Sequence, residues 1–90
     1  MERLDQFFSC YFHQDWPEEA LSWRAVVAQY RAEAVGDEAR LVAEEIERLA
    51  ERHPDDESLE VKVKQLGCYY WPGSPSLYRA WLAEVADALR

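Results

Sequence analysis

Apolar residues recur with the period of an α-helix from the beginning of the chain. Leu4, Phe7, Phe8 and Tyr11 are three or four positions apart, which predicts one apolar helical face over residues 2–12. This spacing is typical of a helix that packs one side against a core and leaves the other side in water.

A second helix is predicted to begin where Asp15 precedes Trp16 and Pro17. An aspartate can cap free backbone N–H groups, and proline suits a first turn because its missing N–H is not needed there. The helix should continue to about Val35, where Gly36 can adopt the left-handed conformation that ends a helix. Its apolar positions are Leu21, Trp23, Val26, Val27 and Tyr30.

The third predicted helix runs from about Glu38 to Arg52, with Asp37 as its cap. Its apolar residues are Ala39, Val42, Ile46 and Leu49, and its other face is charged, so it should be amphipathic and half exposed. His53 and Pro54 end it, because the residue before a proline avoids helical geometry.

A short fourth helix is predicted after Asp55, with Leu59, Val63 and Leu66 facing inward. The alternation from Leu59 to Val63 also fits a strand, but no second strand-like run exists to pair with it. Gly67 ends this segment. Ser74 and Pro75 begin a last helix with the apolar residues Leu77, Tyr78, Trp81, Leu82, Val85 and Leu89.

These patterns predict an all-α fold: one domain over residues 1–90, built as a small bundle of four to five short amphipathic helices. Charge then narrows the choice of partner. The 90 residues carry 18 carboxylates against 10 Lys and Arg, for a net charge of −8. Such a surface repels nucleic-acid phosphates and anionic lipid, so we expect neither as a partner. It favours a basic protein, although solubility alone would also explain the acidity.

The two cysteines, Cys10 and Cys68, are far apart in sequence and form no C-x-x-C pair. We expect both thiols to be small buried apolar groups in a reducing cytoplasm, because no signal peptide or membrane-spanning run is visible. A disulfide between them is a less favoured alternative. Zinc has no supporting motif, and no cofactor is expected.

His13 and Asp15 are the strongest candidates for chemistry. They could form a metal pair or an acid–base pair, but catalytic zinc usually has three protein ligands, and His53 stands alone beside a proline. No nucleophile-elbow motif or glycine-rich phosphate loop is present. The aromatic run from Tyr69 to Trp71 could stack bases, yet the surrounding charge favours core packing instead. We therefore predict a binding protein and no enzyme.

Two motifs resemble those of a protein family. The run YFHQDW at 11–16 and the run LGCYY at 66–70, followed by Pro72, resemble the signature of immunity proteins from contact-dependent growth inhibition systems. The resemblance implies a small cytoplasmic protein that binds and neutralises the carboxy-terminal toxin domain delivered by a neighbouring cell. A generic acidic adaptor or subunit of a cytoplasmic complex is the alternative, and a large filamentous exoprotein encoded upstream would argue against it.

Residues that the family shares are poor candidates for recognising different toxins. We therefore interpret them as structural: Tyr11, Phe12, His13, Gln14, Asp15, Trp16, Gly67, Cys68, Tyr69 and Tyr70. The aromatic ones should be core, and His13 should be mostly buried near the loop at 69–71. The toxin-binding surface is predicted on the acidic face of the third helix and its flanking turns, whose side chains should point to water. Its residues are Asp37, Glu38, Glu44, Glu45, Glu47, Glu51, Asp55, Asp56 and Glu57.

Overall fold

Helices dominate residues 2–19 and 22–90, the part of the chain that the computed structural model describes. No strand occurs among these residues, and five of the helices have 10 to 15 residues, so the predicted all-α fold of four to five short helices is confirmed. The elements are α1 (Glu2–Tyr11), α2 (Trp16–Glu19), α3 (Trp23–Glu33), α4 (Glu38–Arg52), α5 (Asp56–Gln65), the 3-10 turn η1 (Pro75–Leu77) and α6 (Tyr78–Leu89).

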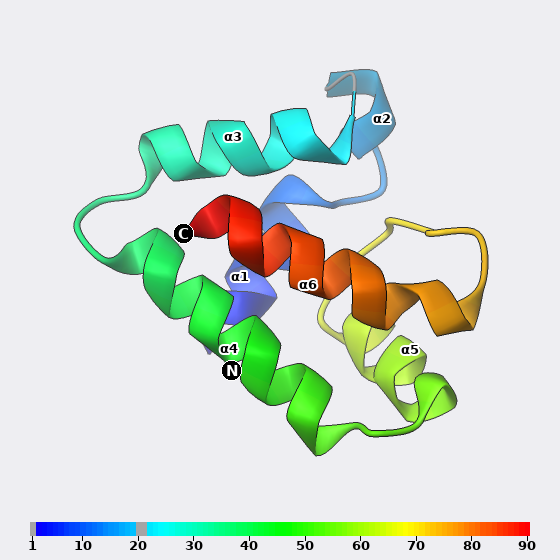
Figure 1. The fold of residues 1–90 in the computed structure, drawn as a ribbon. Coiled ribbons are helices and arrows are strands. Elements are labelled where there is room, and N and C mark those ends of the chain that lie inside the picture. The colour runs from blue at the N-terminus through cyan, green and yellow to red at the C-terminus, as the bar shows by residue number, and fades with distance from the viewer. Residues whose placement is uncertain (1, 20–21) are drawn as a thin grey trace.

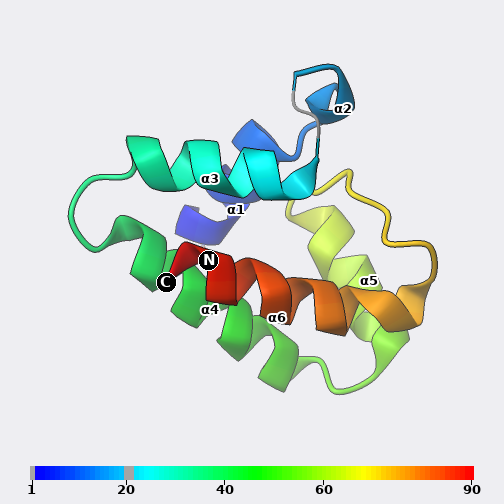
Figure 2. The same cartoon turned by 45° about the horizontal axis from the view of Figure 1, so that its top comes forward.

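The last helix, α6, runs through the middle of the molecule (Figure 1). It packs most extensively against α4, and also against α3 and α5, while α1 packs against α4 and α3. A long loop connects α5 to η1 and passes along the outside of these elements, as the turned view makes visible (Figure 2). The resulting molecule measures 32 × 28 × 20 Å.

Aromatic rings form a large part of the core. Trp81 of α6 is 3 % exposed and lies between rings from several segments. Tyr70 stacks on it with centroids 4.2 Å apart, Phe12 meets it edge-on at 5.3 Å, and Trp23 does so at 6.1 Å. Large buried areas and edge-to-face geometry make such clusters a strong stabilising element in a small protein. The core therefore ties the N-terminal motif, the 68–73 loop and α6 together.

The helix predicted from about Asp15 to Val35 is wrong in one respect, because it is two helices. α2 ends at Glu19 and α3 begins at Trp23, with Ser22 as its cap. The Ser22 hydroxyl accepts a hydrogen bond from the Ala25 N–H at 3.2 Å, which provides a local start signal inside the apolar repeat. Leu21 of that repeat lies outside the described residues.

Cys10 and Leu77 are more exposed than the sequence pattern predicted. Cys10 is exposed, because it lies off the stripe of α1 that buries Leu4, Phe7 and Phe8; only Cys68 is buried. Leu77 is 47 % exposed, since it belongs to the turn η1 and precedes the helical stripe of α6.

The predicted caps have mixed outcomes. Asp55 does cap α5, because its side chain accepts a hydrogen bond from the Ser58 N–H at 2.8 Å. Asp37 does not bond to the N–H groups of α4; its carboxylate pairs with Arg40 at 3.2 Å instead. Ser74 makes no cap bond either, and its hydroxyl lies 2.9 Å from that of Ser76.

Arg79 joins α6 to the end of α4. Its guanidinium donates to the carbonyl oxygens of Ala50 at 2.9 Å and His53 at 2.6 Å. These carbonyls lie at the C-terminal end of α4, where backbone acceptors lack helical partners and carry partial negative charge. A fork-shaped cation that binds two of them caps the helix from a neighbouring element.

Replacing Arg79 with methionine should lower the free energy of unfolding by about 2 kcal/mol, because charge-assisted hydrogen bonds contribute more than neutral ones. Lysine should recover only part of this, since one ammonium cannot reproduce the fork. Urea unfolding measures the loss. Arg48→Met is the control, because Arg48 is 59 % exposed and its carboxylate partner is 3.7 Å away. Equal stabilities of the two methionine variants would contradict the capping role.

Candidate partner-binding surface

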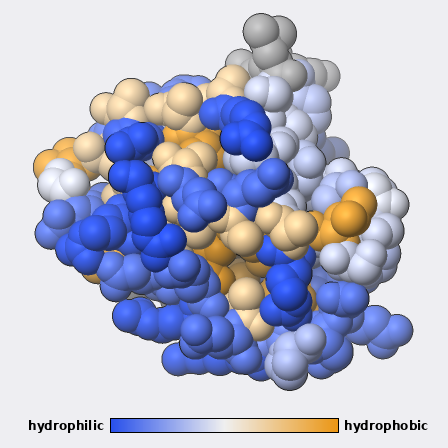
Figure 3. All heavy atoms as spheres, viewed as in Figure 1, coloured by the Kyte–Doolittle hydropathy of each residue, from blue (hydrophilic) through white to orange (hydrophobic). Residues whose placement is uncertain are grey.

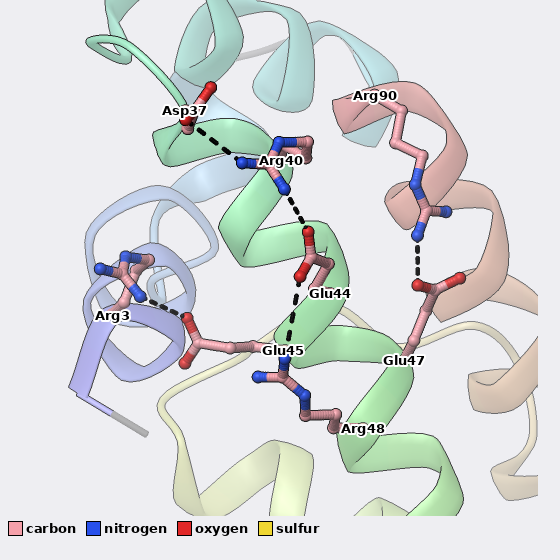
Figure 4. A network of polar contacts seen from close by, with 8 residues as sticks. All are labelled: Arg3, Asp37, Arg40, Glu44, Glu45, Glu47, Arg48 and Arg90. Carbon is pink, nitrogen blue, oxygen red and sulfur yellow. Dashed lines mark hydrogen bonds and ion pairs between the residues drawn. The ribbon is translucent and has the colours of Figure 1, made fainter.

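Helix α4 presents its acidic side chains to arginines from elsewhere in the chain. Arg3 of α1 donates to Glu38 at 2.9 Å and to Glu45 at 3.0 Å, so one guanidinium holds two carboxylates (Figure 4 shows its pair with Glu45). The Glu45 side chain is only 12 % exposed. The expectation that Glu45 points to water is therefore wrong: it belongs to the contact between α1 and α4.

The outer side of α4 carries further ion pairs (Figure 4). Arg40 bridges Asp37 and Glu44, at 3.2 Å and 2.6 Å. Arg90 at the end of the chain pairs with Glu47, and this hydrogen bond lowers the pKa of the Glu47 carboxyl. Much of the negative charge predicted to face a partner is thus compensated within the chain.

Uncompensated acidity begins at the end of α4. Glu51, Asp56 and Glu57 are exposed, and none of them forms an ion pair with any residue that the structure describes. Asp55 lies among them and is occupied in capping α5. In Figure 3 hydrophilic residues cover the lower part of the molecule, where α4 leads into α5. We name Glu51, Asp56 and Glu57 the acidic turn.

The two motif segments meet in space. The Tyr69 N–H donates to the Phe12 carbonyl at 2.8 Å, and the Tyr70 ring contacts those of Phe12 and Trp16, at centroid distances of 6.3 and 5.7 Å. Phe12 is fully buried, and Tyr70, Trp16 and Tyr11 are partly buried. Their packing places these aromatic motif residues in or against the core.

The polar residues of the first motif form a tight turn. His13 is partly buried, and its Nδ1 accepts a hydrogen bond from the Asp15 N–H at 3.1 Å. The Trp16 N–H donates to the His13 carbonyl at 3.0 Å, and Gln14 and Asp15 are exposed. This histidine nitrogen therefore acts as an acceptor for the backbone within its own turn.

Tyr69 and Trp71 are not core residues, contrary to the sequence-based expectation. They are 61 % and 52 % exposed, whereas Cys68 is buried and Tyr70 is partly buried. Burial alternates because successive side chains of an extended segment point to opposite sides. The run Cys-Tyr-Tyr-Trp-Pro between Gly67 and Gly73 contains no polar residue, so its sequence does not indicate which side chains face the core.

The exposed rings border a groove of about 430 Å³. Its lining residues are Lys64, Cys68, Tyr69, Tyr70, Trp71 and Tyr78. Burial raises the pKa of the Cys68 thiol to about 12, so it stays protonated at neutral pH, and burial likewise raises the pKa of Tyr78 to about 12. The Cys68 and Tyr78 side chains that line the groove are therefore uncharged at neutral pH.

Among the side chains that the structure describes, no three His, Cys, Asp or Glu are grouped so as to hold a metal ion. None of the described helices has the length and apolar character needed to cross a membrane.

Fold and surface define a small, acidic, all-α protein with two exposed features, the acidic turn and the aromatic groove. The chain belongs to the CdiI immunity protein family, whose model matches residues 1–89. The resemblance seen in the YFHQDW and LGCYY motifs is thereby confirmed, and the protein is a toxin-neutralising immunity protein. No curated protein and no solved structure matches the chain.

Proposed function

We propose that this protein binds, in the cytoplasm, the carboxy-terminal toxin domain of a contact-dependent growth inhibition effector and keeps that domain inactive. The observation that carries the proposal is the family match over residues 1–89. A toxin with a basic surface is the expected partner, because the chain carries a net charge of −8. Nucleases are such toxins, since an enzyme that holds phosphates needs a basic cleft.

The function is tested by growth. The carboxy-terminal toxin domain of the cognate exoprotein is expressed in a bacterium with and without the chain. We expect growth arrest by the domain alone, growth with the chain, and recovery of a complex of the two proteins. Arrest that persists at full expression of the chain would contradict the proposal.

Within the predicted surface, the acidic turn is the part best suited to attract a basic toxin domain from a distance. Glu51, Asp56 and Glu57 are exposed and have no basic partner among the described residues, whereas Glu45 and Glu47 are held by Arg3 and Arg90. Uncompensated charges contribute most to the field that a distant partner experiences. Changing Glu44, Glu45 and Glu47 together would also break contacts between helices, so it would not isolate binding.

Neutralising the acidic turn should slow association with the toxin domain. Glu51→Gln, Asp56→Asn and Glu57→Gln together remove three negative charges and change the net charge from −8 to −5. Because summed fields raise on-rates by roughly 10- to 1,000-fold, we expect about a three- to tenfold loss of on-rate at low salt and a weaker salt dependence. Stopped-flow mixing at two salt concentrations measures both.

A matched variant carries the same net charge with the changes placed elsewhere. Asp5→Asn, Glu84→Gln and Asp87→Asn also give −5 and involve exposed side chains on α1 and α6. We expect this variant to slow association less than the change in the acidic turn. The opposite order would place the toxin-facing surface near α1 or α6. Equal rates would show that the acidic turn acts only through its share of the overall charge.

A further inference from the structure

The exposed aromatic rings beside α5 have an arrangement that a purely structural loop does not need. Tyr69 and Trp71 expose more than half of their surface and border the same groove. Isolated exposed apolar residues are common on protein surfaces, but large aromatic side chains gathered at one hollow are typical of interfaces. A groove of about 430 Å³ is also within the range of roughly 300–1,000 Å³ found for binding pockets.

The groove is held in shape by contacts with the rest of the molecule. The Tyr78 hydroxyl donates to the Tyr70 carbonyl at 2.9 Å, and the Tyr70 ring stacks on Trp81 in the core. The Trp71 ring meets that of Tyr78 at a centroid distance of 5.9 Å. A binding surface that is already ordered loses less entropy when a partner arrives, which favours affinity.

One cation already lies over a groove ring. The Lys64 ammonium is 5.3 Å from the centroid of the Trp71 ring, and the same ammonium pairs with Glu60 at 2.8 Å. A cation at this distance is attracted by the negative face of the indole. Lys64 therefore shows that the ring face of Trp71 is accessible and suited to a positively charged group.

Charge decides which occupant fits the groove. A second copy of the chain would bring together two molecules of net charge −8, and an anionic ligand would meet the same repulsion. A cationic side chain would be attracted. The outer face of α5 continues toward the acidic turn, because Glu57, Val61 and Lys64 share one helical stripe, with Glu57 about 10 Å along the helix from Lys64.

We infer that this groove is the anchoring site for an arginine or lysine side chain of the toxin domain, which takes the place of Lys64 against the rings of Trp71 and Tyr69. The inference rests on the proposed function and adds the chemistry of recognition to it. The acidic turn speeds the approach of the toxin, and the aromatic groove retains it. Lys64 remains neutralised by Glu60 when the incoming cation displaces it from the ring.

The test measures the association and dissociation rates of the cognate toxin domain that passes the growth test above. Trp71→Ala should weaken binding by about 30-fold, mostly through faster dissociation, as expected for a central aromatic anchor. Trp71→Phe should lose less affinity than Trp71→Ala, because it keeps an aromatic ring, but it should still bind more weakly than the parent, because a phenyl ring attracts cations more weakly than an indole. Val35→Ala is the control, since Val35 is 85 % exposed at the turn between α3 and α4.

A pair of lysine variants separates the cation from the ring. Lys64→Gln and Lys62→Gln each change the net charge from −8 to −9, so both gain the same long-range attraction for a basic partner. Only Lys64→Gln also clears the Trp71 ring face. It should slow dissociation by about two- to fivefold relative to Lys62→Gln, the range of an exposed cation–π contact.

The outcomes are distinguishable. If the parent chain does not bind the toxin domain, the proposed function and this inference both fail. If the parent binds but Trp71→Ala and Tyr69→Ala dissociate like Val35→Ala, the function stands and the groove is not the anchor. If Lys64→Gln dissociates faster than Lys62→Gln, Lys64 contacts a toxin carboxylate and the cation assignment is wrong. Melting curves show which variants are folded. If Trp71→Ala does not fold, Tyr69→Ala tests the groove in its place.

Discussion

Replacing Phe12 with alanine should lower the free energy of unfolding by about 3–5 kcal/mol. Phe12 is fully buried, and its ring lies edge-on to Trp81 at 5.3 Å and contacts Tyr70 at 6.3 Å. Truncation removes apolar contacts and leaves a cavity that the surrounding rings cannot fill without leaving their own packing. Small proteins have a total stability of only about 5–15 kcal/mol, so this variant should be severely destabilised.

Denaturant unfolding followed by circular dichroism measures the effect. Phe12→Leu should lower the free energy of unfolding clearly less than Phe12→Ala does, because leucine retains most of the volume of the phenylalanine side chain. Val35→Ala should stay within about 0.5 kcal/mol of the parent, as exposed substitutions usually do. A loss below about 1 kcal/mol for Phe12→Ala would mean that the aromatic cluster does not carry the core.

Gly67→Ala should be the most destabilising of the glycine substitutions, lowering the free energy of unfolding by about 2–5 kcal/mol. Two costs combine at this position. The backbone has φ +93°, where a side chain is strained by roughly 1–2 kcal/mol, and an added Cβ would lie 2.9 Å from the Cβ of Ser9 on α1. Overpacking of this kind typically costs a further 1–3 kcal/mol. The glycine therefore lets the end of α5 approach α1 closely.

A substitution at Gly36 measures the backbone strain without the steric contact. This glycine has φ +61° and no atom within 4 Å of an added Cβ, so Gly36→Ala should lose only about 1 kcal/mol. Ser9→Gly combined with Gly67→Ala should show a favourable coupling in a double-mutant cycle. Removing the Ser9 side chain relieves the steric contact with the new Cβ, but the backbone strain at position 67 remains. Equal losses for the two alanine variants, measured by urea unfolding, would show that close approach to α1 is not a constraint.

Local signals explain why α4 was predicted within its observed bounds. Gly36, with φ +61°, marks the turn before it, and the pair His53 and Pro54 marks its end; each acts through the geometry of the neighbouring backbone. The same kind of local signal was missed at Ser22. There a cap interrupts an apolar repeat that otherwise continues, and periodicity alone does not reveal the interruption.

Contacts between distant residues explain the errors at the candidate site. Arg3 and Glu45 are 42 positions apart, and Arg90 and Glu47 are 43 apart, so no pattern in the sequence indicates that they pair. The acidic stripe of α4 was therefore predicted as a free surface, although arginines from α1 and the chain end cover part of it. Tyr69 was predicted to be a core residue because the loop is rich in aromatic residues, but only the packed structure shows that alternate side chains of this loop face solvent.

By itself the sequence determined the all-α class, the bounds of α4, the strongly acidic character and, through two motifs, the immunity family. These properties follow from the spacing of apolar residues, the backbone preferences of glycine and proline, and the overall composition. The first two act over a few residues, and composition is a property of the whole chain. Only the tertiary structure decided which carboxylates stay free and that Tyr69 and Trp71 border a groove. Those features depend on which faces α6 and α4 turn toward their neighbours, and packing of the complete core sets those faces.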